Sequence, residues 1–262
     1  MQQNAKIAVA GATGRVGRHI VDILESRGYD VVPMSRSNGV DVITGEGLDE
    51  ALSGVNTIID VATGPSPEEQ AATEFFTTSA RNLQAAGERA GVRRIAAVSI
   101  IGIDRFSGGY NAAKVAQEQT LQAGPIPVRI VRAAQFHEFV EEIMRWFTQD
   151  DVSHVWKMRT QLVSARTVAE EVVALATAPD AEFDAAQTIE IAGPREERLV
   201  EAARLVAARR GEGLRVEEQP SDPSDPTSEL YANGGALPGP GAKLAGPTFE
   251  EWLEATVPAG RV

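Results

Sequence analysis

The chain has 262 residues, of which 43% are hydrophobic and 24% are charged, so it can bury the core of a globular protein. Its formal net charge of -12 opposes binding to nucleic acid or to an anionic membrane surface, because both bind clustered lysine and arginine. The sequence contains no cysteine, which excludes disulfides, thiol catalysis and cysteine-based zinc sites.

Short apolar runs alternate with segments of helical periodicity along the chain. The first run is too short for a signal peptide or a membrane span, and no later run reaches about 18 residues, so we expect a cytoplasmic protein that does not bind a membrane. Six runs are predicted as strands: Lys6–Ala10, Asp30–Met34, Thr57–Val61, Arg94–Ser99, Val128–Arg132 and Thr188–Ile191. Their alternation with helices predicts an α/β fold, a Rossmann-type doubly wound parallel sheet.

Three helices are predicted between the first five strands. The first carries apolar residues at helical spacing and ends at Gly28, the second runs through Glu68–Ala90, and the third spans Asn111–Ala123. The link from the second strand to the third offers only Leu48–Leu52 as helical material. We therefore expect a shortened crossover at that point.

A glycine-rich loop, Gly11-Ala-Thr-Gly14-Arg-Val-Gly17, joins the first strand to the first helix. The pyrophosphate of a dinucleotide binds backbone N–H groups at a helix N-terminus, and glycines permit the tight turn and the close approach that this requires. Because the loop follows a strand and opens a helix, the sequence predicts a dinucleotide-binding site and not an ordinary turn.

The end of the second strand indicates which dinucleotide binds. A site that prefers NAD usually places an Asp or Glu there to bind the ribose hydroxyls. This chain has Ser35, Arg36 and Ser37 instead. An arginine flanked by hydroxyl groups suits a 2′-phosphate, so the sequence favours NADP(H) over NAD(H). The alternative is a solvated loop arginine.

Tyr110 and Lys114 stand four residues apart at the start of the third helix, and so share one face of it. A nearby ammonium group favours the phenolate, so we expect Lys114 to lower the pKa of Tyr110 and allow proton exchange with a substrate oxygen. Lys114 could also hold the nicotinamide ribose. Ser99, at the end of the fourth strand, is a candidate donor to the same oxygen, or else a serine that satisfies backbone groups.

Beyond residue 132 the alternation of strands and helices weakens. We predict a dinucleotide-binding core over residues 1–132, with a further strand at about 188–192, and a mainly substrate-binding lobe over residues 133–262. Phe136 and His137 follow the fifth strand, where chain leaving the carboxyl edge of the sheet borders the nicotinamide end of a cofactor. They are candidate substrate-binding residues, and the alternative for His137 is a structural or exposed position.

Three further patterns describe this second half. Thr167–Glu170 and Thr248–Glu251 are predicted capping boxes, each opening a helix. Gly211–Gly246 is rich in Pro, Gly, Ser and Asp, which is typical of a long surface excursion. Neither paired histidines nor converging carboxylates support a metal site.

The motifs together resemble the atypical short-chain dehydrogenase/reductase superfamily, and within it the NmrA-like and NAD(P)H-binding group. The segments that carry the resemblance are the glycine loop, Val98–Asp104, Tyr110–Lys114, Gln135–Phe139, Leu237–Ala242 and Thr248–Leu253. The resemblance implies that Thr13, Arg15 and Val16 help to hold the diphosphate. It also implies that Ala62 and Thr63 lie beside the adenosine half of the cofactor. The spacing from Ser99 to Tyr110 is shorter than is typical of that superfamily.

The expected function is an NADP(H)-dependent oxidoreductase that reduces a small carbonyl, enone or quinone-like substrate, or runs the reverse reaction. The cofactor supplies hydride and Tyr110 handles the proton. One alternative is an NmrA-like redox sensor that binds the dinucleotide and a protein partner without turnover, and another is an isomerase or lyase. The Tyr110–Lys114 pair favours the enzyme, because a sensor has no need of it. Monomer and homodimer both remain open.

Overall fold

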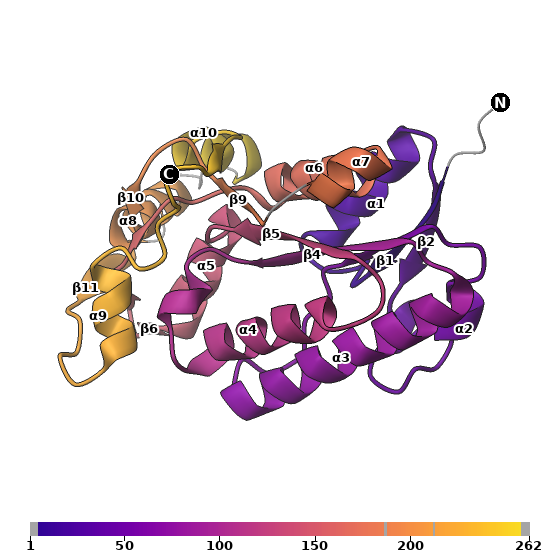
Figure 1. Cartoon of the computed structure of the whole chain (residues 1–262). Coiled ribbons are helices and arrows are strands. Elements are labelled where there is room, and N and C mark those ends of the chain that lie inside the picture. The colour runs from indigo at the N-terminus through magenta and orange to yellow at the C-terminus, as the bar shows by residue number, and fades with distance from the viewer. Residues whose placement is uncertain (1–4, 186–187, 212, 258–262) are drawn as a thin grey trace. The chain divides into compact units, whose positions relative to one another are not determined.

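The computed structural model describes residues 5–185, 188–211 and 213–257 (Figure 1). The chain divides into two compact units, one of residues 1–132 and 168–189, the other of residues 133–167 and 190–262. The segment 168–189 therefore counts with the first unit, although it lies beyond the point where we predicted a substrate lobe to begin. The functional roles assigned to the two parts stay predictions.

Parallel strands form the centre of the first unit. They are β1 (Lys6–Ala10), β2 (Asp30–Met34), β3 (Thr57–Asp60), β4 (Arg94–Ile100) and β5 (Val128–Ala133). Their order is β2-β1-β3-β4-β5, and Ala8 of β1 lies opposite Val32 on one side and Ile58 on the other. The order reverses between β1 and β3, so their carboxyl ends border the crevice in which open α/β sheets bind ligands.

Helices cover both faces of these strands. They are α1 (Gly17–Ser26), α2 (Leu48–Ala51), α3 (Glu69–Ala90), α4 (Gly109–Gln122), α7 (Asp180–Ala185), most of α6 (Ala165–Ala176), and the 3₁₀ turns η1 (Arg36–Asn38) and η2 (Ile103–Arg105). Helices α3 and α4 pack side by side on one face, and α1 and α7 lie on the other (Figure 1). The crossover from β2 to β3 is short, as predicted, and holds α2 together with η1, which was not predicted. The Rossmann-type α/β fold is confirmed.

The longest helix, α3, shows why these segments fold as they do. The Glu68 carboxylate caps its first turn by accepting from the backbone N–H groups of Gln70 and Ala71. Gly91 ends it with a φ of 75°, the left-handed conformation that glycine adopts at no steric cost. Between these ends, buried Leu83 packs in the core that contains strand residues such as Ile58, and buried Phe76 packs with Ala113 of α4.

Helix α6 begins three residues earlier than the predicted capping box at Thr167–Glu170 implies. The Ser164 hydroxyl accepts from the backbone N–H of Thr167 at 3.0 Å, and α6 starts at Ala165. The prediction was wrong because Ser164, a residue type equally suited to capping, precedes Thr167 by three positions. The second predicted box is confirmed, since Thr248 and Glu251 exchange both capping hydrogen bonds at the start of α10 (Phe249–Thr256).

The second unit combines short strands with helices around its own core. The strands are β6 (Thr148–Gln149), β7 (Val152–Trp156), β8 (Arg159–Thr160), β9 (Ile189–Ala192), β10 (Glu197–Arg198), β11 (Arg215–Gln219) and β12 (Lys243–Leu244). The helices besides α10 are α5 (His137–Trp146), α8 (Leu199–Arg210) and α9 (Pro226–Ala232). One sheet has the order β11-β7-β6, β10 pairs with β8, and β12 pairs with β9. Val140, Val155 and Leu199 are among the residues of the core.

The predicted surface excursion at Gly211–Gly246 is more structured than its composition suggested. It contains β11, which pairs in parallel with β7, together with α9 and β12. Val216 is the one apolar residue of β11. The strand lies at the edge of its sheet and alternates exposed and half-buried positions, so it needs few apolar side chains. Such an edge strand carries little of the apolar signal by which strands are predicted.

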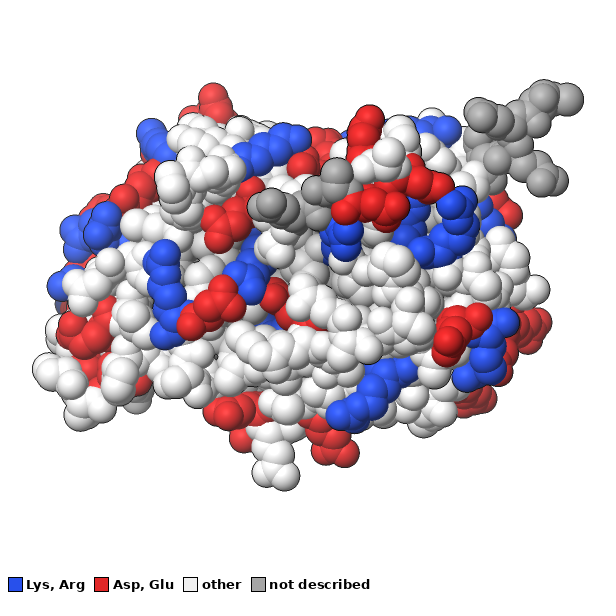
Figure 2. Space-filling model, viewed as in Figure 1, with Lys and Arg blue, Asp and Glu red and all other residues white. Residues whose placement is uncertain are grey.

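Acidic and basic side chains are intermixed on the surface. On the face drawn in Figure 2, basic side chains lie beside acidic ones and do not gather into one patch. Some opposite charges form surface ion pairs, such as Arg89 with Asp49. Within the described residues, no helix is long and apolar enough to cross a membrane.

Candidate active site

The glycine loop lies between β1 and α1, at the carboxyl edge of the first unit's strands. The backbone N–H of Gly11 donates to the Met34 carbonyl at 3.0 Å, which ties the loop to the end of β2. Gly11 has a φ of +82°, and a Cβ there would lie 2.7 Å from the Val61 carbonyl oxygen. A Cβ on Gly17 would lie 2.0 Å from the Gly11 carbonyl oxygen. The packing of the protein itself therefore requires glycine at these two positions.

Gly14 differs from its two neighbours in the motif. It is exposed, and a Cβ there would meet only the Gly11 carbonyl oxygen within 4 Å, at 3.1 Å, among the described residues. The chain's own packing thus does not demand glycine here as it does at Gly11 and Gly17. A bare backbone facing open space at the start of a helix is what a pyrophosphate needs, so the loop fits a dinucleotide.

The start of α1 supports this fit. Val16, at the N-cap position, offers no side-chain hydrogen bond, and the first turn carries no acidic residue. The N–H groups of that turn are therefore not capped by the N-cap side chain and carry the positive end of the helix dipole. Of the residues that the resemblance implied, Thr13 is exposed, Arg15 is half-buried and Val16 is buried, so only backbone groups of Val16 could reach a phosphate.

Ser35, Arg36 and Ser37 follow β2 directly, one residue after Met34 receives the loop's N–H groups. The Ser35 and Ser37 hydroxyls lie 2.9 Å apart, and the Ser35 hydroxyl also donates to the side chain of Asn38. The Arg36 side chain is exposed and forms no ion pair within the described part of the chain. The turn therefore presents a guanidinium group to solvent at the edge where the loop lies. Asn38, which organises the turn, was missed by the sequence analysis.

The end of β3 supplies the opposite wall of the loop. Ala62 is buried, and its Cα would lie 2.8 Å from a Cβ on Gly11, whereas Thr63 is exposed. The backbone N–H of Ala62 donates to the Asp60 carboxylate at 3.1 Å. Asp60 is wholly buried, and burial raises the pKa of its carboxyl group. Its only signal in the sequence is an acidic residue within the apolar run Thr57–Val61.

Tyr110 is the second residue of α4, and its surroundings fix where that helix begins. The Glu69 carboxylate of α3 accepts from the backbone N–H of Gly109 at 2.6 Å. Gly109 has a φ of +66°, so glycine suits this start of the helix. The phenol ring packs edge-to-face on Phe76 with 5.5 Å between centroids. The spacing of four residues places Lys114 on the same face one turn later.

The Lys114 side chain turns inward and is only 6% exposed. Its Nζ donates to the Val98 carbonyl at 2.8 Å and to the Gln117 side-chain oxygen, and lies 4.5 Å from the centroid of Phe76. The Ser99 hydroxyl, one residue beyond Val98, is buried and has no hydrogen-bond partner in the described structure. An unsatisfied buried hydroxyl is costly unless something binds to it, which supports Ser99 as a donor to a ligand.

The protonation states differ from the sequence-based expectation. Burial raises the pKa of Tyr110 to about 12, where we predicted that Lys114 would lower it. The prediction was wrong because the Lys114 ammonium group is directed at Val98 and Gln117, while the phenol is largely removed from water. Burial lowers the pKa of Lys114 to about 8, against the opposing charges of Asp60 and Glu118. Near neutral pH, the phenol is therefore protonated and most of the amine is charged.

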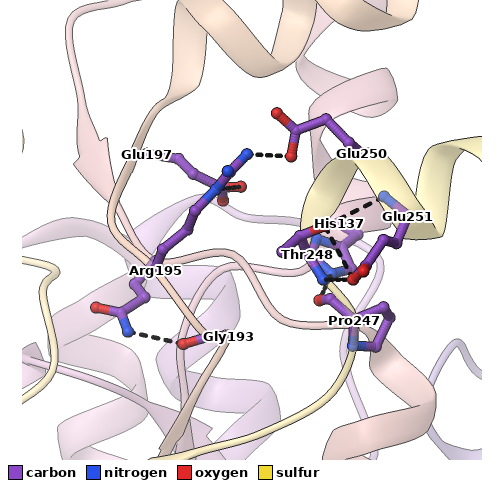
Figure 3. Close-up of polar contacts among 9 residues, drawn as sticks. His137, Gly193, Arg195, Glu197, Pro247, Thr248, Glu250 and Glu251 are labelled. Atoms are coloured by element: carbon purple, nitrogen blue, oxygen red, sulfur yellow. Dashed lines mark hydrogen bonds and ion pairs between the residues drawn. The ribbon is translucent and has the colours of Figure 1, made fainter.

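His137 lies in the second unit, where it opens α5. Its side chain is wholly buried, and Nε2 lies 3.3 Å from the Pro247 carbonyl oxygen, which can only accept (Figure 3). The ring packs against Phe249 and Trp252, and burial lowers the pKa of His137 to about 4. The imidazole is therefore neutral and helps to hold α10. A role for His137 or the half-buried Phe136 toward substrate stays a prediction.

Glu197 lies among the same group of polar residues (Figure 3). Its carboxylate accepts from the backbone N–H groups of Leu162 and Phe249 and lies 3.8 Å from Arg195, yet Oε2 has no partner in the described structure. Burial raises the pKa of Glu197 to about 7. The folded protein thus binds a proton at this position between about pH 4.5 and 7 that the unfolded chain releases.

Glu197→Gln is expected to stabilise the protein at pH 8.5 by about 1–2 kcal/mol, allowing for solvent screening, and to change stability little at pH 4.5. The reason is that the raised pKa favours folding only while Glu197 is protonated, and this contribution is lost as pH rises through 7. Urea unfolding at both pH values measures the effect. Glu217→Gln, at an exposed carboxylate of the same unit, is the control. Equal effects of both variants would contradict the assignment.

Among the described residues, no group of three or more His, Cys, Asp or Glu side chains is placed to hold a metal ion. The comparisons with known proteins also indicate that the chain binds a nicotinamide dinucleotide. A family model described as NAD(P)H-binding matches residues 11–179, which include the glycine loop, Arg36, Tyr110 and Lys114. No curated protein matches the chain in sequence.

Solved structures with the same fold include three whose ligands or activities are informative. A nucleoside-diphosphate-sugar epimerase from Staphylococcus aureus is 16% identical, with a TM-score of 0.72, over 95% of this chain and 99% of that one. An NADPH-dependent quinone oxidoreductase from Escherichia coli, complexed with NADPH, is 17% identical, with a TM-score of 0.72 and the same coverage. A dTDP-4-dehydrorhamnose reductase from Bacillus anthracis, in complex with NADP, is 17% identical, with a TM-score of 0.70, over 96% and 98%.

Proposed function

The chain belongs to the NAD(P)H-binding family, and from this we propose that it is an NADP(H)-dependent reductase of a small carbonyl, enone or quinone-like substrate. The observation that carries the proposal is a pair of side chains on α4, the protonated phenol of Tyr110 and the buried ammonium group of Lys114. This helix belongs to the same unit as the glycine loop. The fold shared with an NADPH-dependent quinone oxidoreductase and an NADP-bound reductase is consistent with it.

In the proposed reaction, each candidate site residue of the first unit has its own role. Backbone groups of the glycine loop and of the first turn of α1 hold the diphosphate, and Ala62 and Thr63 border the adenosine half. A bound NADPH supplies hydride to the substrate carbon. Tyr110 donates its proton to the substrate oxygen, and the Ser99 hydroxyl donates a hydrogen bond to the same oxygen. Lys114, whose ammonium group has one N–H beyond those that bind Val98 and Gln117, holds the nicotinamide ribose.

The protonation of Tyr110 supports reduction as the proposed reaction. A phenol whose pKa is about 12 is a proton donor at neutral pH and a poor proton acceptor. Reduction needs a donor at the substrate oxygen, whereas oxidation of an alcohol needs a base there. A protonated Tyr110 is therefore consistent with the proposed reduction.

Arg36→Ala is expected to weaken NADPH binding by about 1.5–3 kcal/mol and leave NADH binding almost unchanged. The exposed guanidinium group at the end of β2 stands where an acidic residue would select NAD, and its charge suits a 2′-phosphate. Fluorescence titration of both cofactors measures the difference. Arg27→Ala, at another exposed arginine of the same unit, is the control. Equal wild-type affinities for NADPH and NADH would contradict the NADP preference.

The function itself is tested with a panel of quinones, enones and small ketones, following NADPH oxidation by absorbance. Turnover of any member at a rate well above the buffer background supports the reductase. Tight NADPH binding with no turnover across the panel would instead favour a redox sensor.

A further inference from the structure

The buried carboxylate of Asp60 connects two parts of the candidate site. One oxygen, Oδ1, accepts from the backbone N–H of Ala62 at 3.1 Å, next to the point where β3's end packs on Gly11. The other, Oδ2, accepts from the side-chain nitrogen of Gln117 at 3.0 Å. Both oxygens thus receive N–H donors, and this arrangement suits the ionised carboxylate because it leaves no acceptor for a carboxyl proton.

Gln117 lies between two opposite charges, which fixes its orientation. Its nitrogen donates to Asp60 and its oxygen accepts from Lys114 Nζ. An amide can satisfy a carboxylate and an ammonium group together only in this orientation. Gln117 is 3% exposed, so neither contact is replaced by water at low cost.

The charged and titratable groups that face Lys114 are few in the described structure. They are Asp60 from β3 and Glu118 on its own helix, while the neutral Tyr110 contacts the same Phe76 ring as Lys114. Both oxygens of Glu118 are already bound to the Arg132 guanidinium group, at 3.0 and 2.6 Å. Helix α3 contributes the Phe76 ring, and β4 contributes the Val98 carbonyl. Asp60 is therefore the carboxylate not already committed to another cation.

We propose that Asp60 is a positioning residue of the site. Through Gln117 it holds the Lys114 ammonium group in place and in its charged form, and through Ala62 it holds the backbone against which the glycine loop packs. This inference rests on the proposed function, because Lys114 matters to the reaction only if the site reduces a substrate. The linkage itself is a property of the protein without cofactor or substrate.

The protonation of Lys114 is measured directly by NMR of protein labelled with ¹³C at the lysine side chains. The sequence has four lysines, Lys6, Lys114, Lys157 and Lys243, so the spectrum is simple, and Lys114→Met assigns the signal. In the wild type we expect Lys114 to titrate near pH 8. In Asp60→Asn the midpoint falls by roughly 1 pH unit or more, because the buried ammonium group loses its counter-charge. Glu118→Gln, at the carboxylate paired with Arg132, shifts it less.

A second variant tests whether the hydrogen bonds of Gln117, and not only the charge of Asp60, hold Lys114 in its charged form. Gln117→Met removes the amide and leaves Asp60 in place, and it is expected to lower the Lys114 midpoint as well. If the three residues act as one unit, combining Asp60→Asn with Gln117→Met lowers the midpoint by clearly less than the sum of the single shifts. Should Asp60→Asn fail to fold by circular dichroism, Gln117→Met alone carries the test.

Two results would overturn the linkage: an unshifted Lys114 midpoint in the variants that fold, or fully additive shifts. Neither measurement requires turnover. A substrate panel that shows no NADPH oxidation would overturn the proposed function while leaving the Asp60–Gln117–Lys114 linkage intact, so the two failures are distinguishable.

Discussion

Tyr110→Phe is expected to lower kcat roughly 10²–10⁴-fold and to leave the Kd for NADPH unchanged. In the proposed mechanism the phenol acts on substrate, and the glycine loop and the start of α1 hold the dinucleotide, so losing the hydroxyl removes the proton donor alone. The ring's packing on Phe76 is retained by phenylalanine. Steady-state NADPH oxidation with the best substrate of the panel, together with NADPH titration, measures both quantities.

Tyr29→Phe provides the matched control, because it removes a hydroxyl from another tyrosine of the same unit. Its kcat and its NADPH affinity should equal those of the wild type. A Tyr110→Phe enzyme with full activity would refute the assignment of the proton donor. A loss of NADPH affinity in that variant would mean that the phenol supports the cofactor and does not act on substrate.

The pH dependence of the wild-type rate distinguishes the two groups of the pair. Because the pKa of Tyr110 is raised to about 12, the donor stays protonated across the neutral range. Because the pKa of Lys114 is lowered to about 8, its charge is lost as pH rises through 8. The rate of reduction should therefore be flat near neutral pH and fall above about pH 8. A rate that rises through this range would indicate a phenolate base.

The sequence was sufficient for the parts of the fold that depend on local pattern. Alternating strands and helices, the strand before Gly11 and the glycine that follows α1, Gly28, are all short-range signals, and the structure agrees with each. The position of Tyr110 and Lys114 on one helix follows from their spacing alone. Edge strand β11 escaped prediction because its residues are mostly charged and its partner β7 lies about 60 residues away.

The chemistry of the site depended on contacts that no local pattern contains. Glu69, Asp60 and Gln117 come from three different elements, and their roles arise only when α3, β3 and α4 pack together. The pKa of Tyr110 was predicted in the wrong direction for the same reason. Helical spacing places a lysine one turn away, but it does not say that the lysine turns inward or that the phenol is buried. The direction of the pKa shift of Tyr110 is then decided by desolvation, which is a property of the packed unit.

Gly14→Val is expected to weaken NADPH binding roughly 100-fold or more, equivalent to losing one or two charge-assisted hydrogen bonds of the diphosphate. The valine side chain would occupy the space in front of the loop's exposed backbone. The folded state should survive, because the added Cβ meets only the Gly11 carbonyl oxygen, at 3.1 Å, among the described residues. We expect a cost of about 1 kcal/mol in the free energy of unfolding.

The choice of Gly14 over the other glycines of the loop decides whether the result can be interpreted. A side chain at Gly11 or Gly17 would collide with the protein's own backbone, so loss of binding there would follow from damage to the fold. Gly241→Val is the control, since a Cβ at Gly241 meets no atom within 4 Å in the described structure. That variant should bind NADPH as the wild type does. A folded Gly14→Val protein that binds NADPH with unchanged affinity would place the dinucleotide site elsewhere on the chain.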